Sequence, residues 1–172
     1  MGIDLTDKDR LLLANQYEIL ALLKSDEGYA LVADALRSGH KWIYDQHIDS
    51  ELSETLPANK VEHVLNILNI FGSLKDSYRN LPDKTGIDEK NLLFPGFDGN
   101  NESELLIFSQ ALTKNGRYKL TIGDSATNSH FPTTEMYTRM IKRWNELGAP
   151  NYPYSKETIQ EILAARMHPH SR

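Results

Sequence analysis

The chain has 172 residues, of which 40% are apolar and 25% are charged, and its formal net charge is −5. This size and composition are typical of a single globular domain with its own core. The acidic charge disfavours nucleic-acid binding by this chain alone, because such binding depends on a basic surface. The absence of cysteine excludes disulfides, thiol catalysis and thiolate metal sites.

The sequence contains no apolar run of the ~18 residues that a membrane-spanning helix needs. Its first residues carry neither the basic start nor the apolar segment of a signal peptide. We therefore expect a cytoplasmic protein that makes no contact with a membrane.

A helix is predicted over residues 7–24, where Thr6 and Asp9 form a variant of the capping box. Its leucines, with Tyr17 and Ile19, cover most of the helix circumference at about 100° per residue. A helix that is apolar nearly all round lies either at the centre of a core or in a subunit interface.

Two amides, Asn15 and Gln16, stand among these leucines in the middle of the predicted helix. A buried amide without a hydrogen-bond partner costs about 1–3 kcal/mol, so we expect both side chains to be satisfied. They either join the helix to a neighbouring backbone or bind a ligand.

Three further elements precede the middle of the chain. A second helix is predicted over residues 27–37, with Gly39 in its stop signal. The segment 41–48 fits either a short strand or one more helical turn. The longest helix is predicted over residues 58–81 and is ended by Pro82. Its apolar stripe covers half of the circumference or more, so we expect this helix to be the central scaffold.

The second half of the chain begins with a connecting segment, residues 82–98, whose apolar side chains must pack somewhere. Asn101 and Glu104 form a second capping box, which predicts a helix to about residue 114. Residues 117–122 alternate apolar and polar side chains between two glycines, which is the pattern of a strand.

Two helices complete the chain. Thr133 is expected to cap a helix to about residue 147, and Ser155 a helix to about residue 167. Residues 168–172 are expected to be a frayed tail. Together the elements predict a single, mainly all-α domain, in which about six to seven helices surround the long central helix with at most a minor short β-ribbon.

Five short strings occur in one order along the chain. They are R-L-L-L-A-N-Q-Y (10–17), N-L-P-D-K-T-G-I-D-E (80–89), F-P-G-F-D (94–98), N-G-R-Y (115–118) and the pattern P-x-x-E-x-Y-x-R-M-x-x-x-W (132–144). Together they resemble the YfbU family of bacterial and archaeal proteins. The resemblance implies an all-helical array without an agreed activity. Some members of that family are fused to a DNA-binding module, which suggests a regulatory or sensing role.

Several polar residues stand where a ligand could bind. Arg117 has two interpretations: its guanidinium could clamp an anion, or it could satisfy the preceding helix end or an acid among Asp88, Glu89 and Asp98. The candidate ligand-binding residues are Asn15, Gln16, Arg117, Tyr118, His130 and Arg139.

Recognised catalytic patterns are missing. His130 lies in a polar loop, residues 124–130, but a Ser–His–Asp device rarely forms from residues this close in sequence. Asp98 follows F-P-G-F, where a turn or a helix cap is favoured over a catalytic acid. No two histidines have the spacing of a helical metal pair, so no metal site is predicted. Phosphate-binding glycine patterns and G-x-S-x-G are also absent.

The sequence favours an interaction or ligand-binding module that associates with itself, because the first helix carries more apolar surface than a small monomer hides. The alternative is an enzyme of unrecognised type with a polar pocket near Asn15, Arg117 and His130. A third hypothesis is a regulatory protein that acts with a DNA-binding partner through the basic helix face at residues 139–143. No cofactor is expected, and the expected partners are a second copy, another protein or a small ligand.

Overall fold

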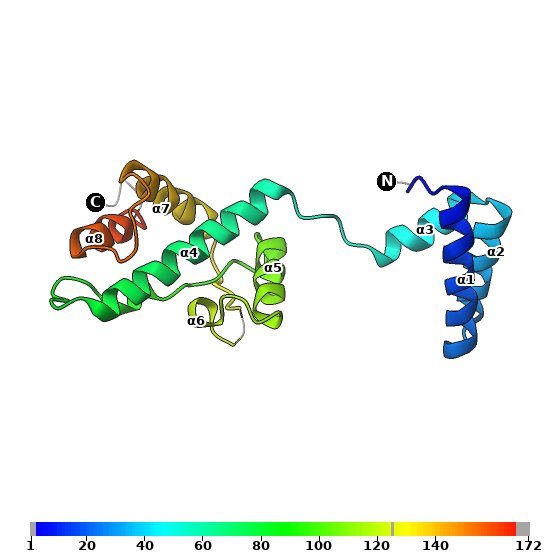
Figure 1. Ribbon diagram of the computed structural model, residues 1–172, viewed down its shortest axis with the longest axis horizontal. Helices are drawn as coiled ribbons and strands as arrows, with labels where there is room; N and C mark the ends of the chain where they lie inside the picture. The colour runs from blue at the N-terminus through cyan, green and yellow to red at the C-terminus, as the bar shows by residue number, and fades with distance from the viewer. Residues whose placement is uncertain (1–2, 125, 168–172) are drawn as a thin grey trace. The chain divides into compact units, whose positions relative to one another are not determined.

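The computed structural model describes residues 3–124 and 126–167, and over these residues every regular element is a helix (Figure 1). This confirms the predicted all-α fold. The chain divides into two compact units, one within Met1–Thr55 and one within Leu56–Arg172. The predicted frayed tail, together with Ser125 of the polar loop, lies outside the described residues.

The first unit contains three helices, α1 (Asp7–Lys24), α2 (Glu27–Ser38) and α3 (Lys41–Glu51). The segment 41–48, for which the sequence leaves two states open, is therefore helical. α1 and α2 lie side by side as a hairpin (Figure 1). The small core of this unit consists of Ala14, Val32, Ala35, Leu36, Tyr44 and Ile48.

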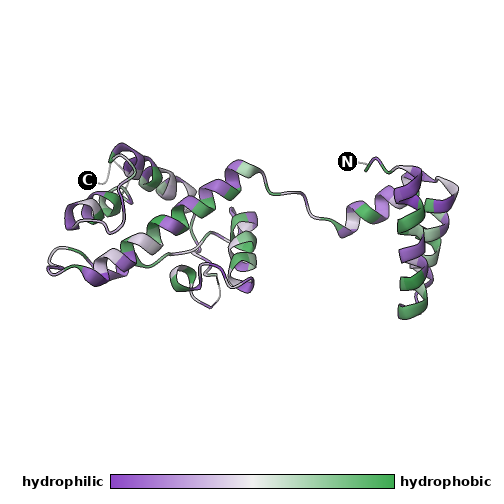
Figure 2. Ribbon diagram, viewed as in Figure 1, coloured by the Kyte–Doolittle hydropathy of each residue, from purple (hydrophilic) through white to green (hydrophobic). Residues whose placement is uncertain are grey.

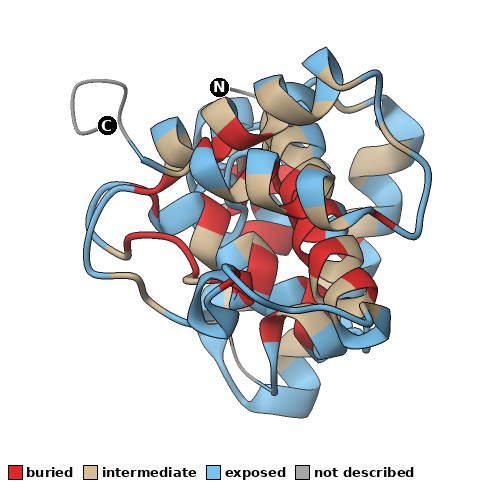
Figure 3. Cartoon of the chain, turned by 90° about the vertical axis from the view of Figure 1, so that its left-hand side faces the viewer, coloured by how far each residue is buried: buried red, intermediate tan, exposed pale blue. Residues whose placement is uncertain are grey.

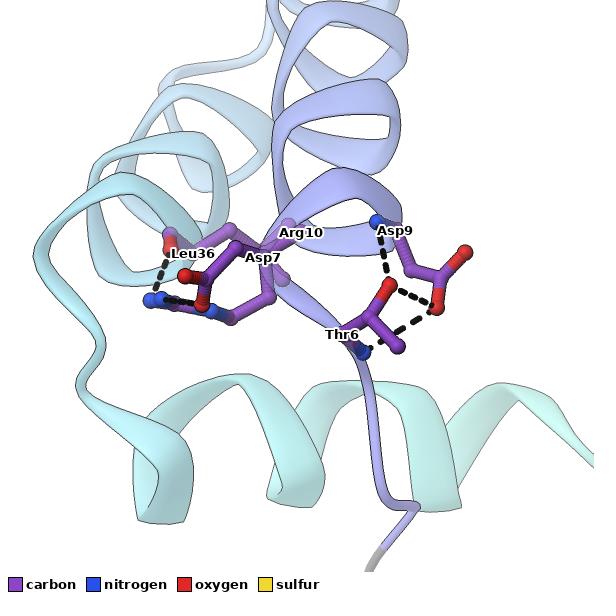
Figure 4. Close-up of polar contacts among 5 residues, drawn as sticks. All are labelled: Thr6, Asp7, Asp9, Arg10 and Leu36. Atoms are coloured by element: carbon purple, nitrogen blue, oxygen red, sulfur yellow. Dashed lines mark hydrogen bonds and ion pairs between the residues drawn. The ribbon is translucent and has the colours of Figure 1, made fainter.

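The predicted start of α1 is confirmed by a complete capping box (Figure 4). The Thr6 hydroxyl accepts a hydrogen bond from the Asp9 N–H (3.2 Å), and the Asp9 carboxylate accepts one from the Thr6 N–H (3.0 Å). Arg10 donates to the Leu36 carbonyl (3.1 Å) and to the Asp7 carboxylate (2.7 Å). The Arg10 guanidinium thus ties the beginning of α1 to the end of α2.

The second unit is built around α4 (Ala58–Asn80), as the sequence predicts. The elements that contact α4 are the 3-10 helix η1 (Glu89–Leu92) and the helices α5 (Ser103–Lys114), α6 (Lys119–Ile122), α7 (Thr134–Glu146) and α8 (Lys156–Ala164). Buried residues, red in Figure 3, gather where these elements pack together. The fully buried apolar side chains of α4 are Val64, Ile67, Leu68, Phe71 and Leu74.

The connecting segment 82–98 packs most of its apolar side chains into this core, although Leu93 stays 56% exposed. The rings of Phe94 and Phe97 lie 5.6 and 5.3 Å from the ring of Tyr137 in α7. The Tyr137 hydroxyl donates a hydrogen bond to the backbone carbonyl of Gly96, in the same segment, at 2.5 Å. Burial raises the pKa of this hydroxyl above its ordinary value, so the proton that makes the bond is retained.

The predicted strand at residues 117–122 is wrong, because this segment forms the single helical turn α6. Tyr118 has a left-handed backbone conformation (φ 56°), which is incompatible with an extended strand at this position. Two N–H groups of the turn then donate to the Tyr118 carbonyl at 3.0 and 2.8 Å. Across the described residues, the expected β-ribbon reduces to an isolated bridge between Phe97 and Asn128.

The side chains predicted to cap α5 and α7 do not do so, and the buried Glu102 carboxylate caps α7 instead. The predicted Asn101–Glu104 box is wrong, since Asn101 instead bonds within the preceding turn. Thr133 does stand at the N-cap of α7, as predicted, but its hydroxyl donates to Glu102 (2.8 Å) and accepts no bond from the helix. The Glu102 carboxylate accepts bonds from the N–H groups of Thr133 (2.7 Å) and Thr134 (2.6 Å), where the helix dipole favours a negative charge.

The last helix begins as predicted. The Ser155 hydroxyl accepts a hydrogen bond from the Thr158 N–H (3.2 Å) and so caps α8. The helix ends at Ala164, before the predicted end near residue 167.

Candidate functional site

α1 presents a row of apolar side chains to solvent. Figure 2 shows several green, hydrophobic stretches along this helix. We name this row the α1 stripe; its residues and exposed fractions are Leu11 (54%), Leu12 (52%), Ile19 (55%), Leu22 (82%) and Leu23 (77%). At about 100° per residue, these side chains lie within about a third of the helix circumference. Within the first unit, α1 therefore has one apolar face packed on α2 and a second apolar face that is uncovered.

The first unit carries most of the exposed apolar surface of the described chain. Of the fifteen large apolar side chains that are exposed, nine lie in this unit. Besides the α1 stripe they are Leu31, Trp42, Ile43 and Leu52. Single exposed apolar residues are common on protein surfaces, but a contiguous row of them marks an interaction site.

Both amides of α1 are exposed, so the burial that their place among leucines suggests is wrong. At about 100° per residue, Asn15 lies within the α1 stripe and Gln16 lies just beyond its edge. The Asn15 side-chain carbonyl accepts a hydrogen bond from Arg37 of α2 at 2.8 Å. Arg37 also forms two hydrogen bonds of 2.9 Å with Glu18. The hydrogen bond from Arg37 lowers the pKa of the Glu18 carboxyl. Asn15 therefore belongs to a polar cluster that joins α1 to α2, and Gln16 faces solvent.

An apolar cavity of about 300 Å³ lies on another side of α1. Its apolar lining residues are Ile3, Leu5, Leu13, Tyr17, Ile48 and Leu52. The ring of His47 lies 5.3 Å from the ring of Tyr17, and its Nε2 atom is buried without a hydrogen-bond partner among the described residues. The first unit is thus incompletely packed beside its own core as well as on its outer face.

A second candidate site is a groove on α4 in the second unit, which the sequence analysis missed except for Tyr118. The Tyr118 hydroxyl donates to the Asn69 side-chain carbonyl at 3.0 Å, and both residues line a cavity of about 460 Å³. The signal that could have revealed this site is a polar row in the long helix at residues 66, 69, 73 and 76, spaced so that all four share one face.

Two other candidate residues stand apart from these sites. The side chain of Arg117 is exposed and pairs with no acid in the described part of the chain. His130 is exposed, has a left-handed backbone (φ 59°) and donates its N–H to Asn128 at 2.9 Å. Among the described loop residues, the His130 ring has no carboxylate or hydroxyl partner. The described residues of this loop, which exclude Ser125, therefore bring no Ser–His–Asp device together.

Arg139 has a structural role. Its guanidinium donates to the carbonyls of Ala165 (3.2 Å) and Arg166 (2.9 Å), just after α8 ends. The neighbouring Arg143 pairs with Glu161 at 2.7 Å, and the Lys142 ammonium lies 3.9 Å from Glu146. The basic helix face at residues 139–143 is thus occupied by helix ends and acids of the same unit.

Asp98 lies in a turn, in agreement with its interpretation as a capping or turn residue. It is buried, accepts a hydrogen bond from the Asn100 N–H (3.2 Å) and donates its own N–H to Glu102 (2.9 Å). Burial acts to raise the pKa of Glu102, but hydrogen bonds from Asp98, Thr134 and Thr133 outweigh it and lower that pKa. This buried cluster is therefore a connection between α5 and α7.

The predicted polar pocket of Asn15, Arg117 and His130 has no support within either unit, because Asn15 belongs to the first unit and the other two belong to the second. No helix within residues 3–124 and 126–167 is long and apolar enough to span a bilayer. Over the same residues, no group of three or more histidines and acids is placed to hold a metal ion.

Comparison with known proteins covers almost the whole chain. A family model described as the YfbU domain matches residues 3–165. A curated relative, the UPF0304 protein MJECS11 of Methanocaldococcus jannaschii, is 30% identical over 164 residues, which cover 91% of this chain and 97% of the relative. The name of this relative states no activity, ligand or partner. The match to the family model spans both compact units.

Proposed function

Since the chain belongs to the YfbU family, we propose that it is a helical interaction module that associates with a second copy of itself through the first unit. The observation that carries this proposal is the α1 stripe. The absence of cysteine fits a cytoplasmic, reducing environment, which we include in the proposal.

The α1 stripe provides the driving force. Complete burial of one leucine side chain contributes about 1.5–3 kcal/mol. Leu22 and Leu23 are 82% and 77% exposed, so nearly all of that contribution is still available from each of them. A partner that covers the stripe gains this energy without any rearrangement of the hairpin core.

The spacing of the stripe favours another copy of α1 as the partner. Leu12, Asn15, Ile19 and Leu22 follow one another at intervals of three, four and three residues. This is the spacing of a coiled-coil seam, in which one helix packs its a and d positions against an equivalent seam. Closed symmetric pairs are the commonest protein oligomers, and they use the same patch on both subunits.

Asn15 gives the seam its specificity. A single amide within an otherwise apolar seam fixes the register and the number of helices, at a cost in stability. Asn15 lies near the middle of α1, so in a symmetric pair it lies close to its own copy. Its bond to Arg37 uses the side-chain carbonyl, and the amide N–H groups remain free to donate across the pair.

The test is light scattering on chromatographic fractions at several protein concentrations. We expect a dimer or a larger closed oligomer for the natural chain. The double substitution Leu22→Glu and Leu23→Glu is expected to give a monomer with unchanged helix content, because glutamate is also a good helix former. The control is Ile107→Glu on α5, where the side chain is 62% exposed in the second unit. A natural chain that stays monomeric at all concentrations contradicts the proposal.

Nothing specific favours the regulatory hypothesis through nucleic acid, because the basic face at residues 139–143 is paired within its own unit. An enzyme of unrecognised type has one supporting observation, the groove on α4, and that groove supports ligand binding more directly than a reaction.

A further inference from the structure

Two cavities adjoin along one face of α4 in the second unit. Their volumes are about 460 and 330 Å³, within the range of small-molecule sites. Both are lined by Asn69, Ser73 and Tyr152, so they form one continuous depression. We name this depression the α4 groove. It lies entirely within the second unit and shares no residue with the α1 stripe.

The floor of the α4 groove is polar although α4 is otherwise a core helix. Asn66, Asn69, Ser73 and Asp76 recur at intervals of three, four and three residues, which places them on one face. Gly72, between them, lets α6 pack closely on α4, because a β-carbon there would lie 3.0 Å from the Thr121 hydroxyl.

Aromatic side chains form the walls. Tyr118 and Tyr152 line one cavity, and Trp144, Tyr152 and Tyr154 line the other. The Trp144 ring N–H donates to the Tyr154 hydroxyl at 2.9 Å, and the Tyr154 N–H donates to Ser77 at 2.8 Å. These hydrogen bonds hold Trp144 and Tyr154 in place before any ligand enters, which reduces the entropic cost of binding.

Tyr118 is held in a strained conformation at the other end. Its φ of 56° is rare for a bulky residue and costs of the order of 1–3 kcal/mol. Its hydroxyl bond to Asn69 fixes the ring over the polar floor. Strain of this kind persists where a side chain must be presented in a particular direction.

The groove has hydrogen-bonding capacity that the protein does not use. Among the described residues, the side chains of Asn66, Ser73 and Asn151 make no hydrogen bond with one another or with other groups. Asn69 uses only its carbonyl, which leaves both amide N–H groups free. The sole ionised lining side chain in the two cavities is Asp76, and it lies 3.3 Å from Arg79.

We propose that the α4 groove binds a neutral sugar. A pyranose ring presents C–H groups on its faces, which pack on aromatic rings, and hydroxyl groups on its edge, which both donate and accept. Amide and hydroxyl side chains of the floor match that edge, since they also donate and accept. The groove lacks a cationic lining group, so it disfavours phosphates and carboxylates.

The experiment is saturation-transfer NMR with the full chain and a panel of neutral sugars: glucose, galactose, mannose, maltose and lactose. We expect signal transfer to the ring C–H protons of at least one of them. Glucose 6-phosphate and adenosine are measured beside them. Absence of transfer to all five sugars overturns the proposal, and so does transfer to glucose 6-phosphate or adenosine alone.

Substitutions locate the binding. Tyr152→Ala removes a wall and Asn66→Ala removes a donor and an acceptor from the floor, and each is expected to weaken binding of the selected sugar about tenfold. The matched control is Asn145→Ala, an exposed amide of α7 that lines neither cavity. Each variant is first shown to be folded by its amide NMR spectrum. Binding that neither groove substitution weakens, or that Asn145→Ala weakens equally, overturns the assignment to the α4 groove.

Discussion

The core around α4 in the second unit contains nineteen buried apolar residues, whereas the core of the first unit contains six. The first unit nevertheless holds nine of the fifteen exposed large apolar side chains of the described chain. A small helical hairpin has too little interior to hide the apolar side chains of a helix that is apolar all round. The second unit thus hides most of its apolar side chains in its own core, whereas the α1 stripe of the first unit stays exposed.

The largest expected effect is a loss of stability that is confined to the second unit and follows a substitution in its core. Phe71→Ala removes a fully buried ring from α4 and should lower the free energy of unfolding of the second unit by about 3–5 kcal/mol. Urea unfolding is followed by the fluorescence of Trp144 in a Trp42→Phe background, which leaves one tryptophan of the two. Leu22→Ala in the first unit should leave this transition unchanged. Equal effects of the two substitutions would contradict the division.

The next effect concerns the polar centre of the second unit. The Glu102 carboxylate accepts bonds from the N–H groups of Asp98, Thr133 and Thr134 and from the Thr133 hydroxyl. Glu102→Ala leaves these donors unpaired in a buried place and should cost about 2–4 kcal/mol at pH 7, measured by the same Trp144 transition. The control is Glu104→Ala in the first turn of α5, where the side chain is exposed, and it should cost less than about 1 kcal/mol.

Acid unfolding tests the same group in another way. The pKa of Glu102 is lowered from its ordinary value of 4.5. Its contribution is therefore complete above that value and is lost as the pH falls through the lower pKa of the folded chain. In Glu102→Gln, the loss of stability below pH 4.5 should be smaller than in the natural chain. If the free energy of unfolding falls equally below pH 4.5 in both proteins, this carboxylate is not the group that titrates.

The sequence predicts the helices that have strong local signals. Residues 7–24 carry a capping box and residues 58–81 carry a continuous apolar stripe, and both signals are local. It fails at residues 117–122, because alternation suggests a strand, whereas the left-handed Tyr118 starts a helical turn. It also misses Glu102, because the groups that this carboxylate caps lie about thirty residues further along the chain.

The candidate sites also divide into one that local sequence signals predict and one that depends on tertiary folding. The apolar surface of α1 is predictable, because helical periodicity alone shows that two faces are apolar. The α4 groove is not, because its walls come from three separate segments that only tertiary folding brings to the floor. The exposure of Asn15 could not be predicted either, since no local signal specifies which face of α1 packs against α2.

A smaller expected effect is a change in self-association, which tests the role of the first unit. Asn15→Leu completes the apolar seam and should strengthen self-association about tenfold, with more than one oligomeric size in solution, because the residue that selects the register is lost. Light scattering across concentrations gives the sizes. Gln16→Leu, beside it on the exposed surface, is the control and should leave the single size unchanged. Weaker association of Asn15→Leu would show that the bond to Arg37, and not the seam, is what Asn15 provides.

The smallest expected effect is a change in the pH dependence of stability, caused by His63 in the second unit. The Nε2 atom of His63 is buried without a partner among the described residues, and its ring lies 6.5 Å from the ring of Tyr137. Burial lowers the pKa of His63 from its ordinary value of 6.5, although the charge of Glu102 acts in the opposite direction.

Between the lowered pKa of His63 and 6.5, the unfolded chain binds more protons than the folded chain, so stability falls as the pH decreases through this range. His63→Leu should remove this fall, with a gain of less than about 1 kcal/mol at pH 5 relative to the natural chain. The measurement is the Trp144 unfolding transition at pH 7 and pH 5. The pH 7 and pH 5 measurements both lie above 4.5, the ordinary pKa of Glu102, below which its contribution is lost. If the difference in stability between pH 7 and pH 5 is the same in both proteins, the titrating group in that range is not His63.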